Sequence, residues 1–433
     1  MEKVIADLHI HSRFARACSS ALNLANLEKW ARVKGITLLG TGDFTHPDYL
    51  QEIKSELSED PELKGVYVSK SGFRFVLQSE ICCIWSSGGR RSVHSCVLAP
   101  SLEVVDQVNA WLSTIGNLKA DGRPMLGLSC AALVEGLRKI SGDIEIFPAH
   151  LWTPWFGAFG SDSGFDSLEE CYGDQVKHVH AIETGMSSDP QMNWRVSELD
   201  STTILSNSDC HSFWPWRLGR ECNVFEFKKP DYAHLLEAIR GGSEKGNGLI
   251  ETIEVDPNYG KYHFDGHRNC GFSCSPEQSR KLNNTCPACR RPLTLGVEHR
   301  VEDLSEKDRG PGFVGERRPG FKKLIPLSEL ISLALGSPLA GKKTWAAYNA
   351  LIERFGTEFN VLLEAGEEEL ERLAPALLTK LVLRNRAGLI KVKPGFDGVY
   401  GEPLMDGVPS AERAEQPSTP SRKAGQKNLL DYA

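Results

Sequence analysis

Histidine and carboxylate residues stand beside strand-like segments throughout the first half of this sequence. The first such segment ends in Asp7-Leu8-His9-Ile10-His11. Side chains alternate along a strand, so His9 and His11 are expected to project from one face, where they can bind one divalent ion. Later apolar segments are flanked by more residues of these types, namely Glu80, His94, His150, Asp209 and His211.

These side chains suit hydrolytic chemistry. Carboxylates can bridge two ions and supply negative charge, while neutral imidazoles bind metals such as zinc or manganese. Ions held in this way activate a water molecule near neutral pH. The alternative is a set of hydrogen-bonded histidines inside a barrel. Because the residues recur at successive strand ends, the sequence predicts a polynuclear site with two or three divalent ions (Zn, Mn or Mg).

A third ion would depend on a less regular set of ligands. The loop Gly40-Thr41-Gly42-Asp43-Phe44-Thr45-His46 supplies Asp43 and His46, which are expected to join His211. In the alternative, Asp43 accepts a hydrogen bond from another ligand and His46 is an ordinary loop histidine.

Arginine and aromatic residues follow the predicted ligands. Arg13 and Arg16 come just after the first motif and are candidates for gripping a phosphate group, unless they belong to a solvated loop. Trp152 and Trp155 follow His150, and three more aromatic residues lie at 213–216. Packing is the ordinary explanation for any one of them, but together they could stack on an extruded base or a single strand. The sequence therefore predicts DNA contacts here.

A second basic region lies beyond the middle of the chain. The whole protein carries a formal charge of -7, yet residues 257–323 contain 13 Lys and Arg against 8 Asp and Glu. Arg317, Arg318, Lys322 and Lys323 cluster at the end of this region. Their charge favours contact with a nucleic-acid backbone over a solvated linker.

Four cysteines form a separate constellation. Cys270 and Cys274 form one pair, and eleven residues separate it from a second pair, Cys286 and Cys289. Four thiolates at such spacing can close a tetrahedral zinc site and order a segment too small to build its own core. A redox pair or free thiols are the alternatives. The histidines at 263, 267 and 299 are interpreted as bystanders.

The chain ends in a polar stretch rich in Pro, Ser and Gly, which predicts a disordered tail. Its last residues include Gln426, Leu429 and Tyr432. Their Gln-x-x-aliphatic-x-x-aromatic pattern resembles the peptide that docks on sliding clamps. The short pattern also arises by chance, and Ala433 stands where a second aromatic residue is common. We expect clamp binding, with an ordinary terminus as the alternative.

Strand-like and helical segments alternate from residue 1 to about 245, which predicts an α/β fold with a parallel barrel and an active site at the strand C-termini. Strands are expected at 3–11, 36–41, 73–81, 93–98, 144–148, 178–184, 202–208 and 222–227. The 433 residues exceed the usual size of one domain. We expect a barrel over 1–245, a zinc-binding module with the basic loop over 246–324, a helical domain over 325–393 and the tail over 394–433.

Helices in the third part are expected at 326–335, 342–355, 358–363 and 367–386, because apolar residues recur there every three or four positions. No apolar run approaches the ~20 residues that span a bilayer. The chain starts with a strand-like segment instead of a signal peptide. We therefore expect a cytoplasmic protein without a membrane partner.

The chain resembles the PHP (polymerase and histidinol phosphatase) superfamily and, within it, the endonuclease Q family. The resemblance is carried by Asp7-Leu8-His9-Ile10-His11-Ser12, by the loop from Gly40 to Pro47, by Pro148-Ala149-His150-Leu151-Trp152-Thr153-Pro154-Trp155-Phe156-Gly157 and by Ser208-Asp209-Cys210-His211-Ser212. The order of barrel, zinc module, helices and tail extends it to nearly the whole chain.

The resemblance implies a PHP-type distorted (β/α) barrel and a particular division of ligands. One ion would bind His9, His11, Glu80 and Asp209, and a second would bind Glu80, His94 and His150. The sequence departs from the family at the third ion. The loop after the first motif lacks the usual histidine, and the histidine of the second motif is displaced to His46.

The resemblance also implies an activity. The expected enzyme is a metal-dependent endodeoxyribonuclease that acts in DNA repair and has Glu80, Asp209 and His211 as catalytic residues. It would incise damaged DNA on the 5′ side of hypoxanthine, uracil, xanthine or an abasic site. Two other interpretations stay open. A small-molecule phosphoesterase would have no use for the zinc module, the basic loop or the tail, and a non-catalytic clamp-binding adaptor would not need the ligand set.

Overall fold

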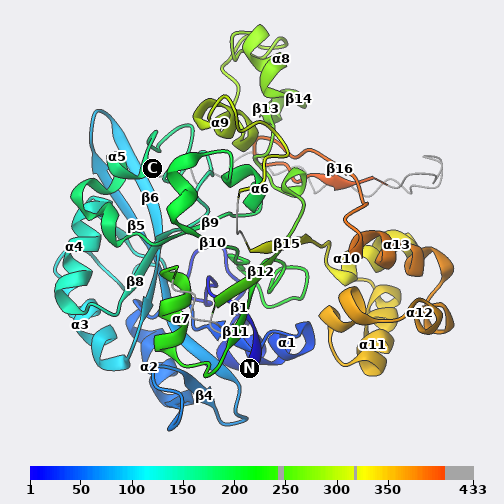
Figure 1. The fold of residues 1–433 in the computed structure, drawn as a ribbon, viewed down its shortest axis with the longest axis horizontal. Helices are drawn as coiled ribbons and strands as arrows, with labels where there is room; N and C mark the ends of the chain where they lie inside the picture. The colour runs from blue at the N-terminus through cyan, green and yellow to red at the C-terminus, as the bar shows by residue number, and fades with distance from the viewer. Residues whose placement is uncertain (242–247, 316–318, 405–433) are drawn as a thin grey trace.

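An eleven-stranded mixed sheet forms the centre of the protein and confirms the predicted α/β class (Figure 1). The computed structural model describes residues 1–241, 248–315 and 319–404. The main path of the sheet runs β15-β12-β11-β1-β2-β5-β4-β3, with β6 and β7 paired to β5 and β8 paired to β6. Its strands are β1 (Glu2–Asp7), β2 (Leu38–Gly40), β3 (Leu57–Glu59), β4 (Tyr67–Ser69), β5 (Arg74–Ser86), β6 (Arg90–Ala99), β7 (Met125–Leu126), β8 (Glu145–Pro148), β11 (Cys222–Phe227), β12 (Gly248–Glu254) and β15 (Gly320–Lys323). β9 (Ala181–Glu183) and β10 (Thr203–Leu205) form a separate parallel pair.

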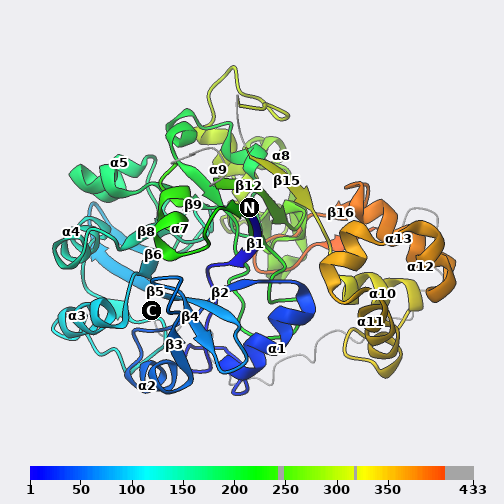
Figure 2. The ribbon, with the colours of Figure 1, turned by 60° about the horizontal axis from the view of Figure 1, so that its bottom comes forward.

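Helices cover the sheet, and Figure 2 shows α2, α3 and α4 along its outer side. The helices of this part are α1 (Leu24–Lys34), α2 (Pro47–Glu56), α3 (Leu102–Leu112), α4 (Cys130–Ile140), α5 (Leu168–Tyr172), α6 (Pro190–Asn193) and α7 (Tyr232–Ile239). α1 starts where the Asn23 side chain accepts a hydrogen bond from Asn26 N, and it ends at Gly35, whose φ is 104°. Leu24, Leu27 and Ala31 form its buried face, which holds it against the sheet.

The expectation of an all-parallel barrel is wrong. β1, β2 and β5 are parallel, but β6 runs antiparallel to β5 and β8, and β11 runs antiparallel to β1 and β12. The cause is local at β5 and β6. Gly88 and Gly89 adopt φ values of 63° and 153° between the two strands, and so short a connection can join only antiparallel neighbours.

A small lobe projects from the sheet at the top of Figure 1. It contains β13 (Asp265–His267), β14 (Phe272–Cys274), α8 (Pro276–Lys281) and α9 (Val297–Leu304). In the sequence it lies between β12 and β15, which pair in parallel at the edge of the sheet. Residues 248–254 and 320–323 therefore belong to the sheet, although the sequence analysis assigns them to the module that starts at 246.

A helical lobe lies at the right of Figure 1. It contains α10 (Leu327–Leu335), α11 (Lys342–Phe355), a π-helical turn (Asn360–Glu364), α12 (Glu367–Leu373) and α13 (Ala376–Arg386). The single helix expected over 367–386 is broken. Pro375 precedes α13 and has no N–H to donate, and it disfavours helical backbone at the residue before it.

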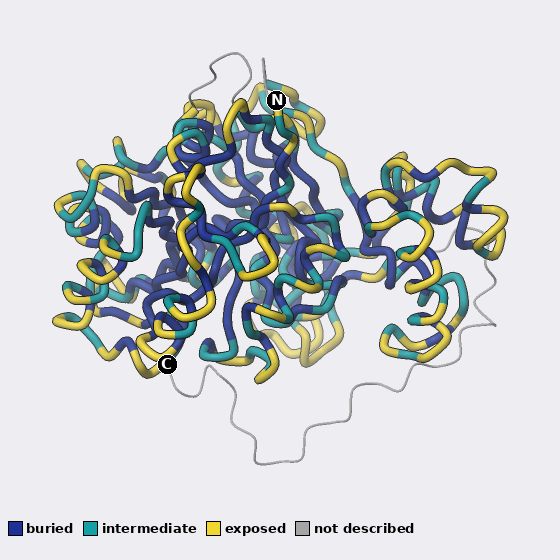
Figure 3. The backbone as a smooth tube through the Cα atoms, turned by 90° about the horizontal axis from the view of Figure 1, so that it is seen from below, coloured by how far each residue is buried: buried dark blue, intermediate teal, exposed yellow. Residues whose placement is uncertain are grey.

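A buried ion pair fixes the helical lobe to the larger part. Lys34 Nζ lies 2.7 Å from Glu358 Oε1 and donates to Pro215 O at 2.8 Å. Tyr348 OH donates to Glu358 Oε2 at 2.8 Å. Figure 3 shows buried chain running through both parts. Because losing one partner of a buried pair leaves an uncompensated charge, this contact specifies one docking geometry.

Residues that follow the helical lobe return to the small lobe. β16 (Val392–Lys393) pairs with β17 (Glu402–Pro403), and Phe396 forms a bridge with Phe264. Residues 394–404, which the sequence analysis assigns to a disordered tail, are therefore packed against the chain. The rest of the expected tail lies outside the described residues. In the part of the chain that the structure describes, no helix is both long and apolar enough to cross a membrane.

Glu254, the last residue of β12, is enclosed at the end of the sheet. Ser206, Thr252 and Thr184 donate hydrogen bonds to its carboxylate. Burial nevertheless raises the pKa of Glu254 to about 7, because the ionised form loses its hydration. The folded protein therefore holds a proton on Glu254 at pH values where the unfolded chain, with a carboxyl pKa of 4.5, has released it.

We predict that Glu254→Gln flattens the pH dependence of stability. A carboxyl whose pKa is raised on folding lowers the free energy of unfolding as the pH rises from 4.5 to about 7, and the loss then stays constant. The total is at most about 3 kcal/mol. Urea denaturation at pH 5 and pH 8 should show the variant losing less stability than the wild type. Glu62→Gln, at an exposed carboxyl, should retain the wild-type difference, and equal losses in Glu254→Gln and wild type would contradict the assignment.

Candidate active site

Two loops at the ends of β1 and β10 hold His9, His11 and Asp209 together. Asp209 N donates to His9 O at 2.9 Å, and His11 N donates to Cys210 O at 3.3 Å, so the two loops run side by side. Their side chains consequently converge. Asp209 Oδ1 lies 3.1 Å from His11 Nε2 and 3.7 Å from His9 Nε2.

The register of the β5–β6 hairpin brings Glu80 and His94 to the same place. Glu80 pairs with Cys96, and Cys82 pairs with His94. Residues two apart on a strand share a face, so Glu80 and His94 are diagonal neighbours. His94 Nδ1 lies 2.8 Å from Glu80 Oε1. His150 follows β8, the strand that pairs with β6. Its Nε2 lies 3.3 Å from Glu80 Oε1.

The converging side chains form two ligand groups that share Glu80. Within each group the ligand atoms all lie within 4.8 Å of one another. The first group is His9, His11, Glu80 and Asp209, and the second is Glu80, His94 and His150. One carboxylate common to both groups is the arrangement that a bridged pair of ions requires.

The buried polar atoms of this centre fit bound metal ions. His9 Nε2 is enclosed and has no hydrogen-bond partner among the described residues, and Glu80 Oε1 faces two imidazole nitrogens without a well-aligned hydrogen bond. Enclosing a polar atom without a partner is costly, and a cation bound between these atoms would satisfy them. Burial lowers the pKa of His94 to about 3, which keeps its imidazole in the neutral form that binds metals.

Hydrogen bonds on the far side of the imidazoles orient them. His9 Nδ1 lies 3.0 Å from both carboxylate oxygens of Glu183, and His150 Nδ1 lies 2.8 Å from Thr153 Oγ1. Each bond fixes the ring and directs Nε2 toward the centre. Glu183 also accepts a hydrogen bond from His150 N at 2.7 Å, so it orients a ligand in each group. A further buried group of His9, Cys96 and Glu183 uses the same side of His9.

Three residues of the site adopt left-handed backbone conformations. The φ angle is 39° at Asp43, 32° at His150 and 44° at Asp209. Such strain costs about 1–3 kcal/mol per residue and persists where the surroundings hold the backbone in place. Gly185 is part of that restraint, because a Cβ on it would come within 2.8 Å of the His150 Cβ. The strain turns these side chains toward the centre at the points where their strands end.

Asp43, His46 and His211 do not form a third ligand group within the described residues. Asp43 Oδ1 lies 2.9 Å from His11 Nδ1, so Asp43 orients His11, as the alternative interpretation of the sequence states. His46 stacks on Phe14, with ring centroids 4.2 Å apart. His211 stays beside the centre. Its ring centroid lies 4.7 Å from that of His11, and its side chain is 32 % exposed.

Arg123 also reaches the centre, and the sequence analysis does not single it out. Its Nη1 donates to Glu80 Oε2 at 3.2 Å. Arg123 follows an Asp121-Gly122 pair before β7. That pair predicts a turn but does not indicate where the arginine points.

The aromatic residues near the site differ in what they contact. Trp152 was expected to meet DNA, but its side chain is only 1 % exposed, and its Nε1 donates to Asn193 Oδ1 at 2.7 Å. It is a core residue. Trp155 remains partly exposed and packs edge-on against Tyr262, with ring centroids 5.6 Å apart. The aromatic residues at 213–216 pack with Trp30 and the helical lobe.

The basic residues expected to bind DNA fall into two places. Arg13 forms an ion pair with Glu52 near the first motif, while the side chain of Arg16 is exposed. Lys322 and Lys323 lie on β15, where they form ion pairs with Glu251 and Asp189. Local carboxylates therefore neutralise three of these four cations. Arg317 and Arg318 lie outside the described residues, as do Gln426, Leu429 and Tyr432.

A second candidate metal site lies in the small lobe, and its ligand group differs from the expected one at a single position. The ligand atoms of His267, Cys270, Cys286 and Cys289 lie within 4.8 Å of one another. Cys274 is not in this group. Its side chain is buried in a small apolar cluster with Cys286 and Leu293.

The register of the β13–β14 hairpin puts both residues on one face. Asp265 pairs with Cys274 and His267 pairs with Phe272, so His267 and Cys274 are diagonal neighbours, but only the His267 imidazole gathers with the thiols of Cys270, Cys286 and Cys289. Each ligand pair then has two intervening residues, His267 with Cys270 and Cys286 with Cys289. This spacing is typical of zinc sites, and it was the signal available in the sequence.

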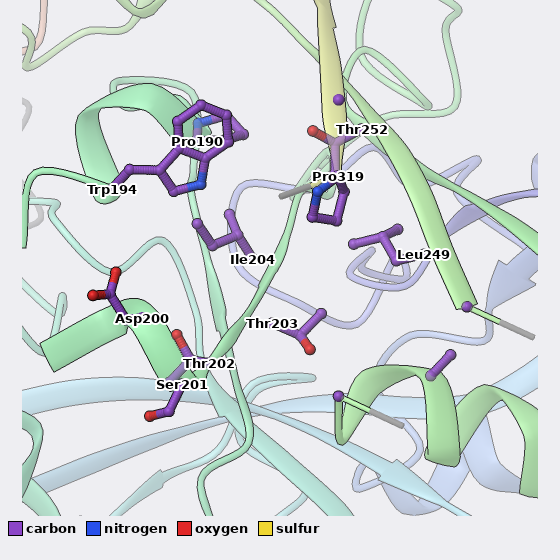
Figure 4. A pocket seen from close by; sticks show the side chains of 14 residues that line it. Pro190, Trp194, Asp200, Ser201, Thr202, Thr203, Ile204, Leu249, Thr252 and Pro319 are labelled. Carbon is purple, nitrogen blue, oxygen red and sulfur yellow. The ribbon is translucent and has the colours of Figure 1, made fainter. Parts of the chain in front are cut away.

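A cavity of about 590 Å³ opens at another place, beside β10, α7 and β12 (Figure 4). Trp194, Thr203, Ile204 and Leu249 are among its lining residues. None of the candidate metal ligands lines it. The candidate active site is therefore defined by the converging ligands and not by this cavity.

Comparison with protein families and curated proteins gives three matches. Residues 326–387 match the family described as the MJ0043 C-terminal domain. The uncharacterized protein MJ0043 of Methanocaldococcus jannaschii is 35 % identical over 257 residues, which are 58 % of this chain and 31 % of that protein. The chain thus spans about a third of the length of that relative. The uncharacterized protein YqxK of Bacillus subtilis is 29 % identical over 93 % of this chain and 99 % of its own length.

Two solved structures are similar over nearly the whole chain. The first is the lesion-specific endonuclease PfuEndoQ from Pyrococcus furiosus, with a TM-score of 0.82, 29 % identity and coverage of 93 % of this chain and 95 % of that one. The second is endonuclease Q in complex with a 27-mer duplex substrate that has an abasic lesion at the active site. It has a TM-score of 0.83, 29 % identity and coverage of 95 % and 98 %.

We predict that Glu80→Gln lowers the bound divalent metal more than His94→Ala does. Glu80 belongs to both ligand groups, whereas His94 belongs to one. An amide cannot supply the charge that bridges two ions, so the first variant should lose both and the second should lose one. Inductively coupled plasma mass spectrometry of desalted protein measures the ratio of metal to protein. Glu62→Gln should match the wild type, and full metal content in Glu80→Gln would contradict the shared ligand.

A second pair of variants tests the small lobe. We predict that His267→Ala releases the metal of this lobe, because three thiolates cannot close a tetrahedral site, while Cys274→Ser retains it. Zinc released by a thiol-modifying reagent can be measured with a colorimetric chelator. The reverse result, with zinc lost from Cys274→Ser and kept in His267→Ala, would restore the four-cysteine set.

Proposed function

We propose that this chain, which is similar in structure to endonuclease Q over nearly its whole length, is a member of that family and a lesion-specific DNA endonuclease whose reaction takes place at the Glu80 centre. The observation that carries the proposal is the pair of ligand groups sharing Glu80, in a fold similar over 95 % of the chain to endonuclease Q bound to a duplex with an abasic lesion. The surrounding part of the sheet with its helices is, on this proposal, a PHP-type barrel.

The proposed reaction is hydrolysis of one phosphodiester on the 5′ side of the lesion. Water adds to phosphorus, the P–O3′ bond breaks, and the strand is left with a 3′ hydroxyl and a 5′ phosphate. Two divalent ions bound at the centre would lower the pKa of that water and neutralise charge on the phosphate oxygens. Zinc, manganese and magnesium all suit the mixed carboxylate and imidazole donors.

The protein groups of the centre have distinct roles in this proposal. Glu80 and Asp209 are the carboxylates that hold the ions, and Glu183 and Asp43 keep the imidazoles of His9 and His11 turned toward them. His211 is partly exposed and lies beside His11. Its position supports a contact with the departing 3′ oxygen or its proton.

The substrate is proposed to be a duplex with an abasic site or with deaminated hypoxanthine, uracil or xanthine. A damaged nucleotide pairs weakly and costs less to extrude from the stack. Trp155 is the partly exposed aromatic residue next to His150 and suits a contact with the extruded nucleotide. A structural zinc ion in the small lobe would hold its loops together, and the C-terminal peptide would recruit the enzyme to a sliding clamp.

Two observations weigh against the other candidate functions. A phosphoesterase for small molecules needs neither the small lobe nor the helical lobe. Yet the small lobe is framed by two strands of the sheet, and the helical lobe forms a buried ion pair with Lys34 of α1. A non-catalytic adaptor has no need for strained backbone at Asp43, His150 and Asp209.

The test is cleavage of a labelled duplex with one central abasic-site analogue, in the presence of Mg²⁺, Mn²⁺ or Zn²⁺. We predict a single nick immediately 5′ of the lesion and no cut in an undamaged duplex. Asp209→Ala should cut at least about 100-fold more slowly, because a ligand and its negative charge are lost.

Asp106→Ala is the matched control, since Asp106 is an exposed carboxylate that pairs with Lys54 on α2. It should cut at the wild-type rate. Intact lesion strands with every metal, together with hydrolysis of a small phosphate monoester, would favour the phosphoesterase. No hydrolysis of either substrate by metal-loaded protein would favour the adaptor.

A further inference from the structure

Arg123 is the cation of the candidate active site. Within the described residues, it is the only lysine or arginine that forms an ion pair with a candidate metal ligand. Its Nη1 lies 3.2 Å from Glu80 Oε2, the oxygen that faces His11 at 3.2 Å. The side chain is 22 % exposed while that of Glu80 is fully enclosed, so the guanidinium lies between the buried ligands and the open side of the centre.

The loop that carries Arg123 is tied to the loop after the first motif and to the loop that carries Asp43. Gly122 N donates to Phe14 O at 3.0 Å, and Thr45 Oγ1 donates to Gly122 O at 3.0 Å. The contact is close, because a Cβ on Gly122 would come within 2.4 Å of Asp43 Oδ2. A loop held at this distance positions its arginine with little freedom, which is the condition for electrostatic stabilisation without reorganisation.

The guanidinium has donors left over. Among the described residues its only side-chain hydrogen bond is the one to Glu80. Arginine carries five N–H donors in a planar fork that matches two oxygens of a phosphate group. In addition, Asp43, His46 and His211 do not gather into a third ligand group within the described residues. A phosphate bound at the Glu80 centre therefore meets the free edge of Arg123.

We propose that Arg123 is a catalytic residue that binds a non-bridging oxygen of the scissile phosphodiester and stabilises its charge during cleavage. This inference rests on the proposed function, because it assumes that a phosphodiester occupies the centre. In this proposal the Arg123 guanidinium supplies the positive charge that a third metal ion would otherwise provide. It also distinguishes Arg123 from Arg13, whose guanidinium is paired with Glu52.

The experiment compares Arg123→Gln and Arg123→Lys with the wild type on two substrates, the abasic-analogue duplex and bis(p-nitrophenyl) phosphate. Single-turnover rates should fall about 100-fold or more in Arg123→Gln on both, in line with the loss of one preorganised donor at a developing charge. Arg123→Lys should recover part of the rate. Metal content should stay at the wild-type value in both variants, and so should duplex affinity measured with Ca²⁺ to within a few fold.

Lys119→Gln is the control, since it removes a positive charge from the same loop at an exposed position paired with Asp48. It should cut at the wild-type rate.

Wild-type rates in Arg123→Gln would overturn the proposal. So would a parallel loss of metal and activity, because Arg123 would then act only by orienting Glu80. If the wild type hydrolyses the ester but not the lesion duplex, the proposed function fails and the ester rates alone decide the role of Arg123. If it hydrolyses neither, both proposals are overturned.

Discussion

The negative charge of Glu80 has no access to water, and the rest of the active site is arranged around that constraint. A carboxylate in such a place is stable only beside positive charge. Here the surroundings consist of four imidazoles, one guanidinium and a second carboxylate, with the imidazole nitrogens turned inward. The negative groups around two of them, among which are Glu183 for His9 and Asp43 for His11, raise the pKa values of these two imidazoles well above 6.5. In the metal-free protein protons on these rings offset the carboxylates, and bound ions would take the place of those protons.

The need to bring side chains from several strands to one point explains backbone conformations that would otherwise be unfavourable. Asp43, His150 and Asp209 each sit at the end of a strand and adopt left-handed backbone, which L-residues avoid. An extended continuation would carry their side chains past the centre. The strain is held by backbone bonds such as Asp209 N to His9 O and by the close approach of Gly185 to His150. Folding free energy from the sheet thus maintains a geometry that a free loop would relax.

The sequence was sufficient where local periodicity determines the outcome. His9 and His11 share a face because strands alternate, and α11 has the bounds that apolar spacing and flanking glycines predict. It was insufficient where tertiary contacts decide. His267 and Cys274 lie on one face of a hairpin, and only the positions of their side chains show that His267 gathers with the other three cysteines. Trp152 looks like an exposed stacking residue next to His150, yet its indole N–H is bonded to Asn193 in the core. Arg123 precedes a two-residue strand and belongs to no motif.

The loop from Asp209 to Arg220 connects the candidate metal ligands with the helical lobe. At one end Asp209 faces the two histidines of the first motif, and at the other Arg220 donates to Ser208 O at 2.9 Å. Between them, Pro215 O accepts a hydrogen bond from Lys34, which is paired with Glu358 of the helical lobe. Trp214 and Trp216 stack on each other and pack against Trp345 of α11. The position of a metal ligand must be fixed to within a fraction of an ångström. The loop that begins with Asp209 therefore needs packing contacts that a solvent-exposed loop would lack. The helical lobe closes over it, so the position of Asp209 depends on a domain that contributes no ligand of its own.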